Sequence, residues 1–315
     1  MLNWLSVALS MSLYVLTLRC RYDFVVATMP PITLALPAYC AKLRHRARLI
    51  ADVRDVYPDV AIAMGYWAKN SLTSRIVALI SSSTYRAAHL VLCVTESARR
   101  EIVARGSDPA KTVVAVNGFD SVSSAPESPY QRLTGEFIAA FIGNMGLATG
   151  LDVIIDAATH LRDESRIRFV LAGGGADKDR LVARIVAEHL DNVTMLGVVP
   201  RDQANALIAD ADVSVVPLHR SIVDSLPTKI FDAFAFKRAV ICCADGEARA
   251  LMERSGGGIA LPPEDGAALA NALRKLSKEP ALLAACAARG HAYVLEHYDR
   301  SQVMRAVAAR LATIT

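Results

Sequence analysis

The sequence lacks the cysteine pattern of a secreted or zinc-binding protein. Its cysteines show no metal-ligand spacing, and most of them lie in apolar runs: Cys20, Cys40, Cys93, Cys242, Cys243 and Cys286. This pattern favours reduced core residues in a cytoplasmic protein, because disulfides persist mainly in oxidising compartments. A large charge excess is also absent, since the net charge is +4 over 315 residues and the basic residues are scattered. The composition therefore gives no support to a nucleic acid partner.

Residues 1–20 are strongly apolar but lack the marks of a signal peptide. No basic segment precedes the apolar run, no clear small-residue cleavage site follows it, and Ser6 and Ser10 interrupt it. The run is also short for a membrane span. We expect a helix that packs on a sheet and that could touch a bilayer surface. The basic cluster from Lys42 to Arg48 indicates a solvated helix end, with contact to anionic lipid as the alternative.

Short apolar runs alternate with helical patterns through both halves of the chain. This alternation predicts an α/β protein with parallel sheets and crossover helices. A length of 315 residues with 53% hydrophobic residues suits two domains, each with its own core. The expected strands are 24–27, 49–53, 90–94, 113–116, 137–142, 168–172, 193–196, 213–216, 240–242 and 258–261. A polar, proline-punctuated stretch predicts a linker at 121–135, between domains at 1–120 and 136–297.

The segment around position 230 carries the most informative pattern. Two carboxylates, Asp224 and Asp232, lie eight positions apart, and a helix is expected just after Pro227, because proline is favoured in a first helical turn. The helix N-terminus around Thr228 and Lys229 would attract an anionic oxygen. Together these groups suit a phosphorylated polyol such as a nucleotide sugar. An ordinary amphipathic helix with exposed acids is the alternative.

Two glycine-containing turns follow strands of the second half. The turn Gly143–Gly146, with a helix expected near Thr149, lets the backbone approach a ligand closely, although plain tight turns share this pattern. The run Gly173–Gly175 lacks both the G-x-G-x-x-G spacing and the acidic strand end of a dinucleotide site. We therefore assign it mainly a structural role. An NAD-dependent oxidoreductase is a further alternative, because such enzymes have the same alternating pattern. This chain, however, lacks their dinucleotide fingerprint.

Polar residues also follow a strand of the first half, in the string Asp-Val-Arg-Asp-Val-Tyr-Pro-Asp at positions 52–59. Parallel α/β sheets collect their functional groups at the carboxyl ends of strands. Arg54, Asp55 and Tyr57 are therefore candidates for a binding site. An Arg54–Asp55 ion pair that merely closes the strand is the alternative.

These segments resemble glycosyltransferase family 4, retaining enzymes of the GT-B fold, and in particular a bacterial branch that makes surface polysaccharides. The stretch from Asp224 to Asp232 resembles the donor motif of an acidic residue, seven others and Glu, although both acids are Asp here. Gly143–Gly146 resembles the donor loop, and positions 52–58 resemble the branch's Asp-x-Arg-Asp-x-Trp/Tyr-Pro signature. The resemblance covers residues 20–310, with the motifs in order. It implies two Rossmann-like βα domains that face a cleft, with the final helix, 298–315, returning to the first domain.

The resemblance also implies roles for individual residues. Asp232 would hold ribose hydroxyls, Asp224 would act at the sugar ring, and Asp55 would serve the acceptor hydroxyl as a second catalytic group. Many family members have Arg and Lys where this chain has Asn144 and Thr149. Other basic residues, Lys229 first and Arg201 second, would therefore have to neutralise the donor diphosphate. The implied donor-binding residues are Gly143, Asn144, Met145, Gly146, Arg201, Ser225, Leu226, Pro227, Thr228, Lys229 and Asp232, with Arg54 and Tyr57 on the acceptor side. We expect no metal or other cofactor, because this fold usually stabilises the leaving diphosphate with helix dipoles and basic side chains.

One departure from the family concerns the start of the chain. The family begins with a strand and a Gly-Gly loop, whereas residues 1–20 resemble its second unit. We therefore expect an incomplete first domain, through either a misassigned start codon or a degenerate copy.

The resemblance implies transfer of a sugar, with retention, from a nucleoside diphosphate donor such as a UDP-sugar. The acceptor would be lipid-linked or a saccharide, in the biosynthesis of O-antigen, capsule or exopolysaccharide. The protein would be cytoplasmic, with the inner face of the cell membrane as a further location. A non-catalytic nucleotide-sugar-binding or scaffold protein is the alternative.

Overall fold

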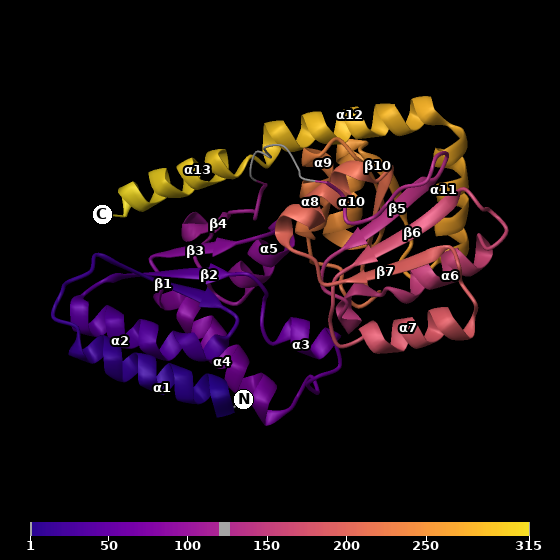
Figure 1. Ribbon diagram of the computed structural model, residues 1–315. Coiled ribbons are helices and arrows are strands. Elements are labelled where there is room, and N and C mark those ends of the chain that lie inside the picture. Colours follow the sequence, from indigo (N-terminus) through magenta and orange to yellow (C-terminus); the bar gives the residue numbers. More distant parts are fainter. Residues whose placement is uncertain (1, 120–126, 315) are drawn as a thin grey trace. The chain divides into compact units, whose positions relative to one another are not determined.

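The computed structural model describes residues 2–119 and 127–314, so the expected linker at 121–135 lies partly outside the described residues. The chain forms two compact units, Met1–Val116 with Val303–Thr315 and Asn117–Gln302. Each unit is built on one parallel sheet, and Figure 1 shows the elements of both. The α/β architecture expected from the alternating pattern is confirmed.

The sheet of the first unit has the strand order β1-β2-β3-β4. Its strands fall where the apolar runs predicted them, because strands covered on both faces read as nearly continuous apolar segments. The strands are β1 (Phe24–Met29), β2 (Arg48–Val53), β3 (Leu90–Cys93) and β4 (Thr112–Val114). The helices are α1 (Leu2–Thr17), α2 (Ala35–His45), α3 (Asp59–Ala63), α4 (Leu72–Ala87) and α5 (Glu96–Ala104), with 3-10 turns η1 (Ile32–Leu34) and η2 (Pro109–Lys111).

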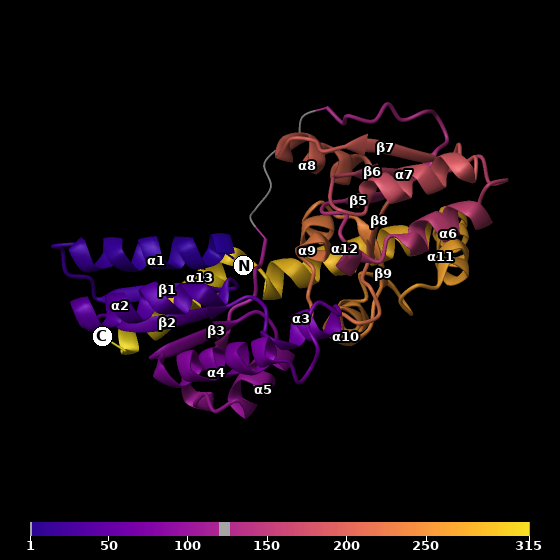
Figure 2. The same cartoon turned by 90° about the horizontal axis from the view of Figure 1, so that it is seen from below.

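Helix α1 packs mainly along α2, and not on the sheet as expected for residues 1–20 (Figure 2). The residues it buries are small, Ala8 and Ser12, and the Ser12 hydroxyl donates to the Ala8 carbonyl at 2.7 Å. Small buried side chains let a helix approach its neighbour closely. Within residues 2–119 and 127–314, no helix combines the length and the apolar character needed to cross a membrane.

The sheet of the second unit has the order β10-β9-β8-β5-β6-β7. The chain starts at β5, runs outward to β7, and returns to the other side of β5 at β8, which creates a topological switch point between β5 and β8. The strands are β5 (Phe137–Ile142), β6 (Ile167–Ala172), β7 (Val193–Gly197), β8 (Val213–Pro217), β9 (Ala239–Cys243) and β10 (Gly258–Leu261). The helices are α6 (Asp152–His160), α7 (Lys178–Ala187), α8 (Arg201–Asp210), α9 (Thr228–Ala235), α10 (Gly246–Ser255), α11 (Gly266–Lys278), α12 (Pro280–His297) and α13 (Arg300–Thr313), with the 3-10 turn η3 (Leu147–Thr149).

Both faces of this sheet are covered by helices, and β5 shows how. Its alternate residues Ala139 and Phe141 pack in the cluster that contains α6 and α11, whereas Ile138 and Ala140 pack with Leu207 of α8. Side chains of a strand point to opposite faces in turn, so each face of β5 contributes to a different core. Ligands of such doubly wound sheets bind at the switch point, outside the carboxyl ends of the strands.

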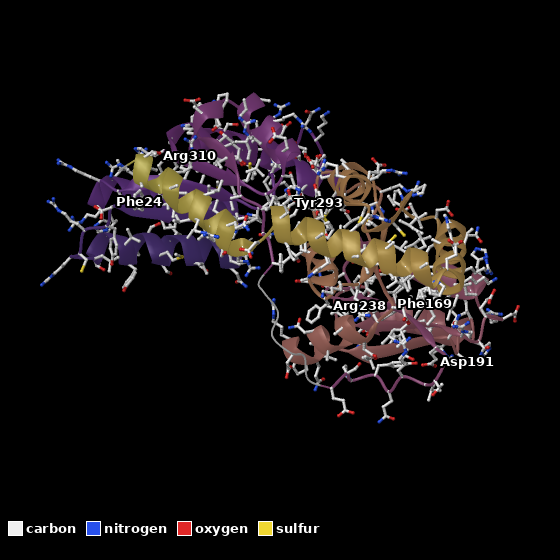
Figure 3. All side chains as sticks on the ribbon, turned by 90° about the horizontal axis from the view of Figure 1, so that it is seen from above. Phe24, Phe169, Asp191, Arg238, Tyr293 and Arg310 are labelled. Carbon is white, nitrogen blue, oxygen red and sulfur yellow. The ribbon has the colours of Figure 1, made fainter. Side chains whose placement is uncertain are left out.

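The last helical pattern breaks between α12 and α13, as predicted near residue 298. Main-chain hydrogen bonds hold this break, from Phe119 N–H to the Tyr298 carbonyl (3.0 Å) and from Arg300 N–H to the Phe119 carbonyl (3.1 Å). Beyond it, α13 enters the first unit, where Arg310 donates to the Ala110 carbonyl at 2.6 Å (Figure 3).

Candidate functional site

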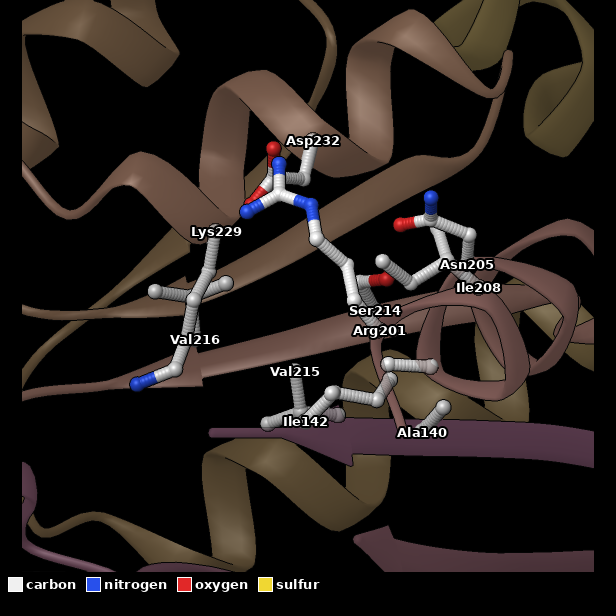
Figure 4. Close-up of a pocket in the computed structure, with 11 residues that line it drawn as sticks. Ala140, Ile142, Arg201, Asn205, Ile208, Ser214, Val215, Val216, Lys229 and Asp232 are labelled. Atoms are coloured by element: carbon white, nitrogen blue, oxygen red, sulfur yellow. The ribbon is translucent and has the colours of Figure 1, made fainter. Parts of the chain in front are cut away.

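A pocket of about 110 Å³ lies at the switch point of the second unit (Figure 4). Strands β5 and β8 and helices α8 and α9 supply its lining: Ala140, Ile142, Arg201, Ala204, Asn205, Ile208, Ser214, Val215, Val216, Lys229 and Asp232. The structure thus brings three of the predicted donor-binding residues together, Arg201, Lys229 and Asp232. Arg201 comes from α8, and Lys229 and Asp232 come from α9. Strand β8 and a loop separate these two helices in the sequence.

Helix α9 places two of these residues. It begins at Thr228, with Pro227 before it in an extended conformation, as the proline predicted. Ile230, Phe231 and Phe234 are fully buried and fix the helix in the core. Lys229 and Asp232, three positions apart, therefore share the opposite face.

Among the residues that line the pocket, Lys229 has a pKa well below its ordinary value. Its ammonium lies 4.7 Å from the centre of the Phe141 ring, within the range of a cation–π interaction. Burial lowers the pKa of Lys229 to about 8, and the Asp232 carboxylate acts in the opposite direction. The side chain passes over Gly143, where an added Cβ would lie 2.3 Å from Lys229 Cε. The lysine therefore carries a charge near neutral pH beside the glycine loop.

Arg201 and Asp232 complete the polar side of the pocket. Figure 4 shows the Arg201 guanidinium extending toward the Asp232 carboxylate. Asn205 and Ser214, which sequence reasoning missed, add an amide and a hydroxyl to the lining. Ser214 is the polar residue of an otherwise apolar strand, a signal that could have identified it. Cationic and hydroxyl-binding groups above apolar walls suit a ligand that carries both phosphate and hydroxyls.

The Gly143–Gly146 loop is braced by the glycine run at 173–175. Gly143 N–H donates to the Ala172 carbonyl (2.9 Å), and Met145 N–H donates to the Gly174 carbonyl (2.8 Å). Gly173 has a φ of +144°, and a Cβ there would lie 1.9 Å from the Gly143 oxygen. The Met145 side chain is fully buried, so this predicted donor-binding residue anchors the loop through the core and does not offer a side chain to a ligand.

The other loop residues also differ in exposure. Thr149 is buried, and its hydroxyl donates to the carbonyls of Gly146 and Asn144. The helix expected near Thr149 is the turn η3, and α6 begins at Asp152 because Gly150 takes a left-handed φ of +59°. Asn144 is exposed and is the polar side chain that the loop presents to solvent.

The predicted residues just before α9 do not line the pocket. Asp224 is exposed, and Ser225, Leu226 and Pro227 are half-buried in the segment that leads to the helix. Glu247 N–H donates to the Val223 carbonyl at 3.0 Å and so fixes the start of this segment. Because Asp224 does not line the pocket, its predicted role at the sugar ring stays a prediction.

In the first unit, the carboxyl end of β2 carries an acid that sequence reasoning did not select. Asp52 is buried, accepts a hydrogen bond from the Thr28 hydroxyl (3.0 Å) and pairs with Arg54 (3.0 Å). Desolvation raises the pKa of Asp55. Burial raises the pKa of Tyr57, and the nearby charge of Asp55 adds to this effect. Tyr57 is half-buried whereas the Asp55 side chain remains exposed at the surface, so the desolvation at this strand end is only partial.

Two Asp-x-Asp strings occur in the second unit, at 177–179 and 210–212, and at least one acid of each is engaged in an ion pair. Asp177 pairs with Arg180 (2.6 Å), and Asp212 pairs with Arg132 (2.6 Å). Across the part of the chain that the structure describes, no group of three or more His, Cys, Asp or Glu residues is arranged to hold a metal ion.

The chain is similar to known proteins over both units. A model described as "Glycosyl transferase 4-like domain" matches residues 2–118, and one described as "Glycosyl transferases group 1" matches residues 136–279. The Pseudomonas aeruginosa protein WbjE, whose name gives it as a probable glycosyltransferase, is 22% identical over 266 residues. These residues cover 81% of this chain and 66% of WbjE.

The Salmonella typhimurium protein WcaL, whose name places it in colanic acid biosynthesis as a glycosyltransferase, is 24% identical over 242 residues, or 73% of this chain and 58% of WcaL. The chain thus spans between about half and two thirds of the length of these relatives. A crystal structure of Anabaena HepE in complex with UDP and glucose matches with a TM-score of 0.77 and 18% identity, covering 98% of this chain and 81% of that one. The chain belongs to the group 1/4-like family of glycosyltransferases with the GT-B fold.

Proposed function

We propose that this chain binds a UDP-sugar and transfers the sugar, with retention, to a hydroxyl of a lipid-linked or saccharide acceptor in cell-surface polysaccharide biosynthesis. The observation that carries this proposal is the pocket in which Lys229, Arg201 and Asp232 meet at the switch point. HepE, which shares the fold, has been crystallised with UDP and glucose, and the name of WcaL refers to colanic acid, a polysaccharide. Both support this choice of donor and pathway class.

On the donor side, Lys229 and Arg201 neutralise the diphosphate, together with the N-terminal amides of α9. Asp232 accepts hydrogen bonds from ribose hydroxyls, and Asp224 binds the sugar ring. The backbone of Gly143–Gly146 lets the diphosphate approach closely, because its glycines carry no side chain. These groups stabilise the negative charge that develops on the leaving diphosphate, so the proposal includes neither a metal nor another cofactor.

On the acceptor side, Asp55 accepts the proton of the attacking hydroxyl, and Arg54 and Tyr57 orient the acceptor. Desolvation raises the pKa of Asp55, which makes its ionised form a stronger base. We place the protein in the cytoplasm, on the inner face of the cell membrane, where a lipid-linked acceptor is reached.

Thermal unfolding with nucleotides tests the donor assignment. A ligand that binds only the folded state stabilises it by about 2.7 kcal/mol at a hundredfold excess over Kd, so saturating UDP should raise the melting temperature by several degrees. GDP and TDP serve as comparison ligands. Melting curves that all three nucleotides leave unchanged would contradict the proposed donor site.

Replacement of Asp55 by Asn should lower the rate of sugar transfer by about 10²–10⁴-fold, because it removes the proton acceptor. UDP affinity should remain unchanged, since Asp55 lies in the first unit and the pocket in the second. Because the pKa of Asp55 is raised, wild-type activity should fall as the pH drops through that raised value and the carboxylate becomes protonated. Asp23→Asn, an exposed acid of the same unit, is the control. Full activity in Asp55→Asn would remove this residue from the mechanism.

A binding protein without transferase activity is the second candidate. The observation that favours it is the pair Asn144 and Thr149, which stand where many family members carry bases. UDP binding without sugar transfer to any lipid-extract or saccharide acceptor would support this reading.

A further inference from the structure

We infer that Arg180, a residue outside the pocket, is a positioning residue for the donor. It ties the turn at 173–177 to the start of α6 and thereby holds the Gly143–Gly146 loop in the shape that receives the diphosphate. The inference rests on the proposed function, because it names a residue on which donor binding depends. Its test includes a measurement without nucleotide, so the failure of the one can be told from the failure of the other.

The first observation is that the loop takes its shape from the turn at 173–177. Besides the main-chain bonds already described, Asp177 N–H donates to the Met145 carbonyl at 3.0 Å. The contact is close, because a Cβ at Gly175 would lie 2.5 Å from the Met145 oxygen and 2.6 Å from Asn144 Oδ1. The position of the turn therefore sets the main chain of Met145 and the side chain of Asn144, which is the exposed polar group of the loop.

The second observation is that Arg180, in the first turn of α7, binds two carboxylates at once. Its Nε and Nη2 donate to Asp177 at 2.6 and 2.8 Å. Its Nη1 and Nη2 donate to Asp152 at 2.9 and 2.6 Å. Each carboxylate thus receives two N–H donors, the arrangement in which an arginine fixes geometry as well as charge.

These two carboxylates lie at the two ends of the structure that surrounds the loop. Asp177 ends the turn, and Asp152 begins α6, the helix that follows the loop and η3. Hydrogen bonds from Arg180 are the largest cause that lowers the pKa of Asp152, so this pair stays ionised at neutral pH. Arg180 therefore joins the turn to the chain segment that leaves the loop.

The burial of Asp177 makes this connection important. Its side chain is 8% exposed, and a buried carboxylate that loses its cation is strongly unfavourable. Within residues 2–119 and 127–314, Arg180 is the cation that pairs with Asp177. Without Arg180, the turn would have to move so that water could reach the carboxylate. Met145 and Asn144 would move with it.

Arg184, one helical turn further along α7, offers a matched comparison. It pairs with Asp152 at 3.0 Å, with Asp156 at 2.5 Å and with Glu188 at 2.6 Å. None of these partners, which are the ones the described residues supply, belongs to the turn at 173–177. Loss of Arg184 should therefore loosen α7 from α6 and leave the loop in place, whereas loss of Arg180 should release the loop.

Amide hydrogen exchange of the nucleotide-free chain tests the positioning directly. In Arg180→Met, the amides of Met145 and Asp177 should exchange at least about tenfold faster than in the wild type, because their hydrogen bonds join the loop to the turn. In Arg184→Met, the same two amides should keep their rates. The melting temperatures of the two variants should fall by similar amounts, since both arginines form partly exposed ion pairs.

Titration calorimetry tests the consequence for the donor. Arg180→Met should weaken the binding of UDP and of inorganic diphosphate equally, by roughly tenfold, because the loop receives the diphosphate and not the ribose. Arg184→Met should bind both ligands like the wild type. Arg180→Lys keeps the charge but cannot donate to both carboxylates in pairs, so it should recover only part of the affinity.

Unchanged exchange at Met145 and Asp177 in Arg180→Met would overturn the inference. Equal losses of UDP affinity in Arg180→Met and Arg184→Met would also overturn it, because they would trace to the general loosening of α7. A wild-type chain that binds neither UDP nor inorganic diphosphate would contradict the proposed function itself. Faster exchange in Arg180→Met would then show that Arg180 braces the loop without serving a donor.

Discussion

Replacement of Lys229 by Met is expected to weaken UDP binding by roughly thirtyfold and, at neutral pH, to raise the melting temperature of the free protein. A hydrogen bond to a charged group contributes about 2 kcal/mol, which sets the loss of affinity. The gain in stability follows from the lowered pKa of Lys229, because burial makes its charged form unfavourable in the folded state. Methionine keeps the contact with Phe141 and Gly143 without the charge.

The pH dependence has a defined sign. The pKa of an unfolded lysine is near 10.4, whereas burial lowers the pKa of Lys229 to about 8. Between these values the unfolded chain binds more protons, so wild-type stability should rise with pH through this window. UDP affinity should fall over the same range, because Lys229 loses its charge. Both trends should be reduced in Lys229→Met.

Titration calorimetry and melting curves at several pH values measure these effects. Lys275→Met, an exposed lysine of α11, is the control and should change neither affinity nor stability appreciably. Unaltered UDP affinity in Lys229→Met would exclude this lysine from the diphosphate site. Reduced stability at neutral pH would show that its charge is better compensated in the fold than the lowered pKa indicates.

The second large effect is expected for Asp232→Asn. The change removes a carboxylate that faces the pocket but keeps its size, and should weaken UDP binding by about 1–3 kcal/mol if the carboxylate bonds the ribose hydroxyls. The loss should be smaller for inorganic diphosphate, which has no ribose. The fold should persist, because the core of α9 consists of Ile230, Phe231 and Phe234.

Asp163→Asn, an exposed acid in the same unit, is the matched control for this variant. Equal losses for UDP and inorganic diphosphate would indicate that Asp232 acts by positioning Arg201 and not through the ribose. Normal affinity for both ligands, with normal stability, would return Asp232 to the alternative of an ordinary helix acid.

The sequence was informative wherever one local rule decides the structure. The strands of both sheets follow from apolar runs, and the start of α9 follows from Pro227, because proline favours the first turn of a helix and no distant contact overrides it. There was less reason in the sequence to expect that Arg201 and Asp232 would line the same pocket. Each was selected through its motif, but their common pocket depends on how α8 and α9 flank the switch point.

Other features depend on packing that a linear pattern does not encode. Met145 occupies a loop position that resembles a ligand contact, yet its side chain is buried in the hydrophobic core of the second unit. Residues 1–20 show large apolar residues all around the helix, so their periodicity could not indicate that Ala8 and Ser12 would form the buried side. Asp52 was overlooked because an acid within an apolar strand is recognised as functional only when its partners, Thr28 and Arg54, are known.

The interlocked glycines also determine where this loop can be redesigned. A side chain at position 173 would collide with the Gly143 backbone, and one at position 143 would displace Lys229. Position 145 is closed as well, because its side chain fills the core. Asn144 alone combines an exposed side chain with a place in the loop. Substitutions at Asn144 should therefore change the surface of the loop with little loss of folding stability, whereas substitutions at positions 143 and 145 should not. Variation in donor preference through this loop, by design or by evolution, is thus expected at position 144.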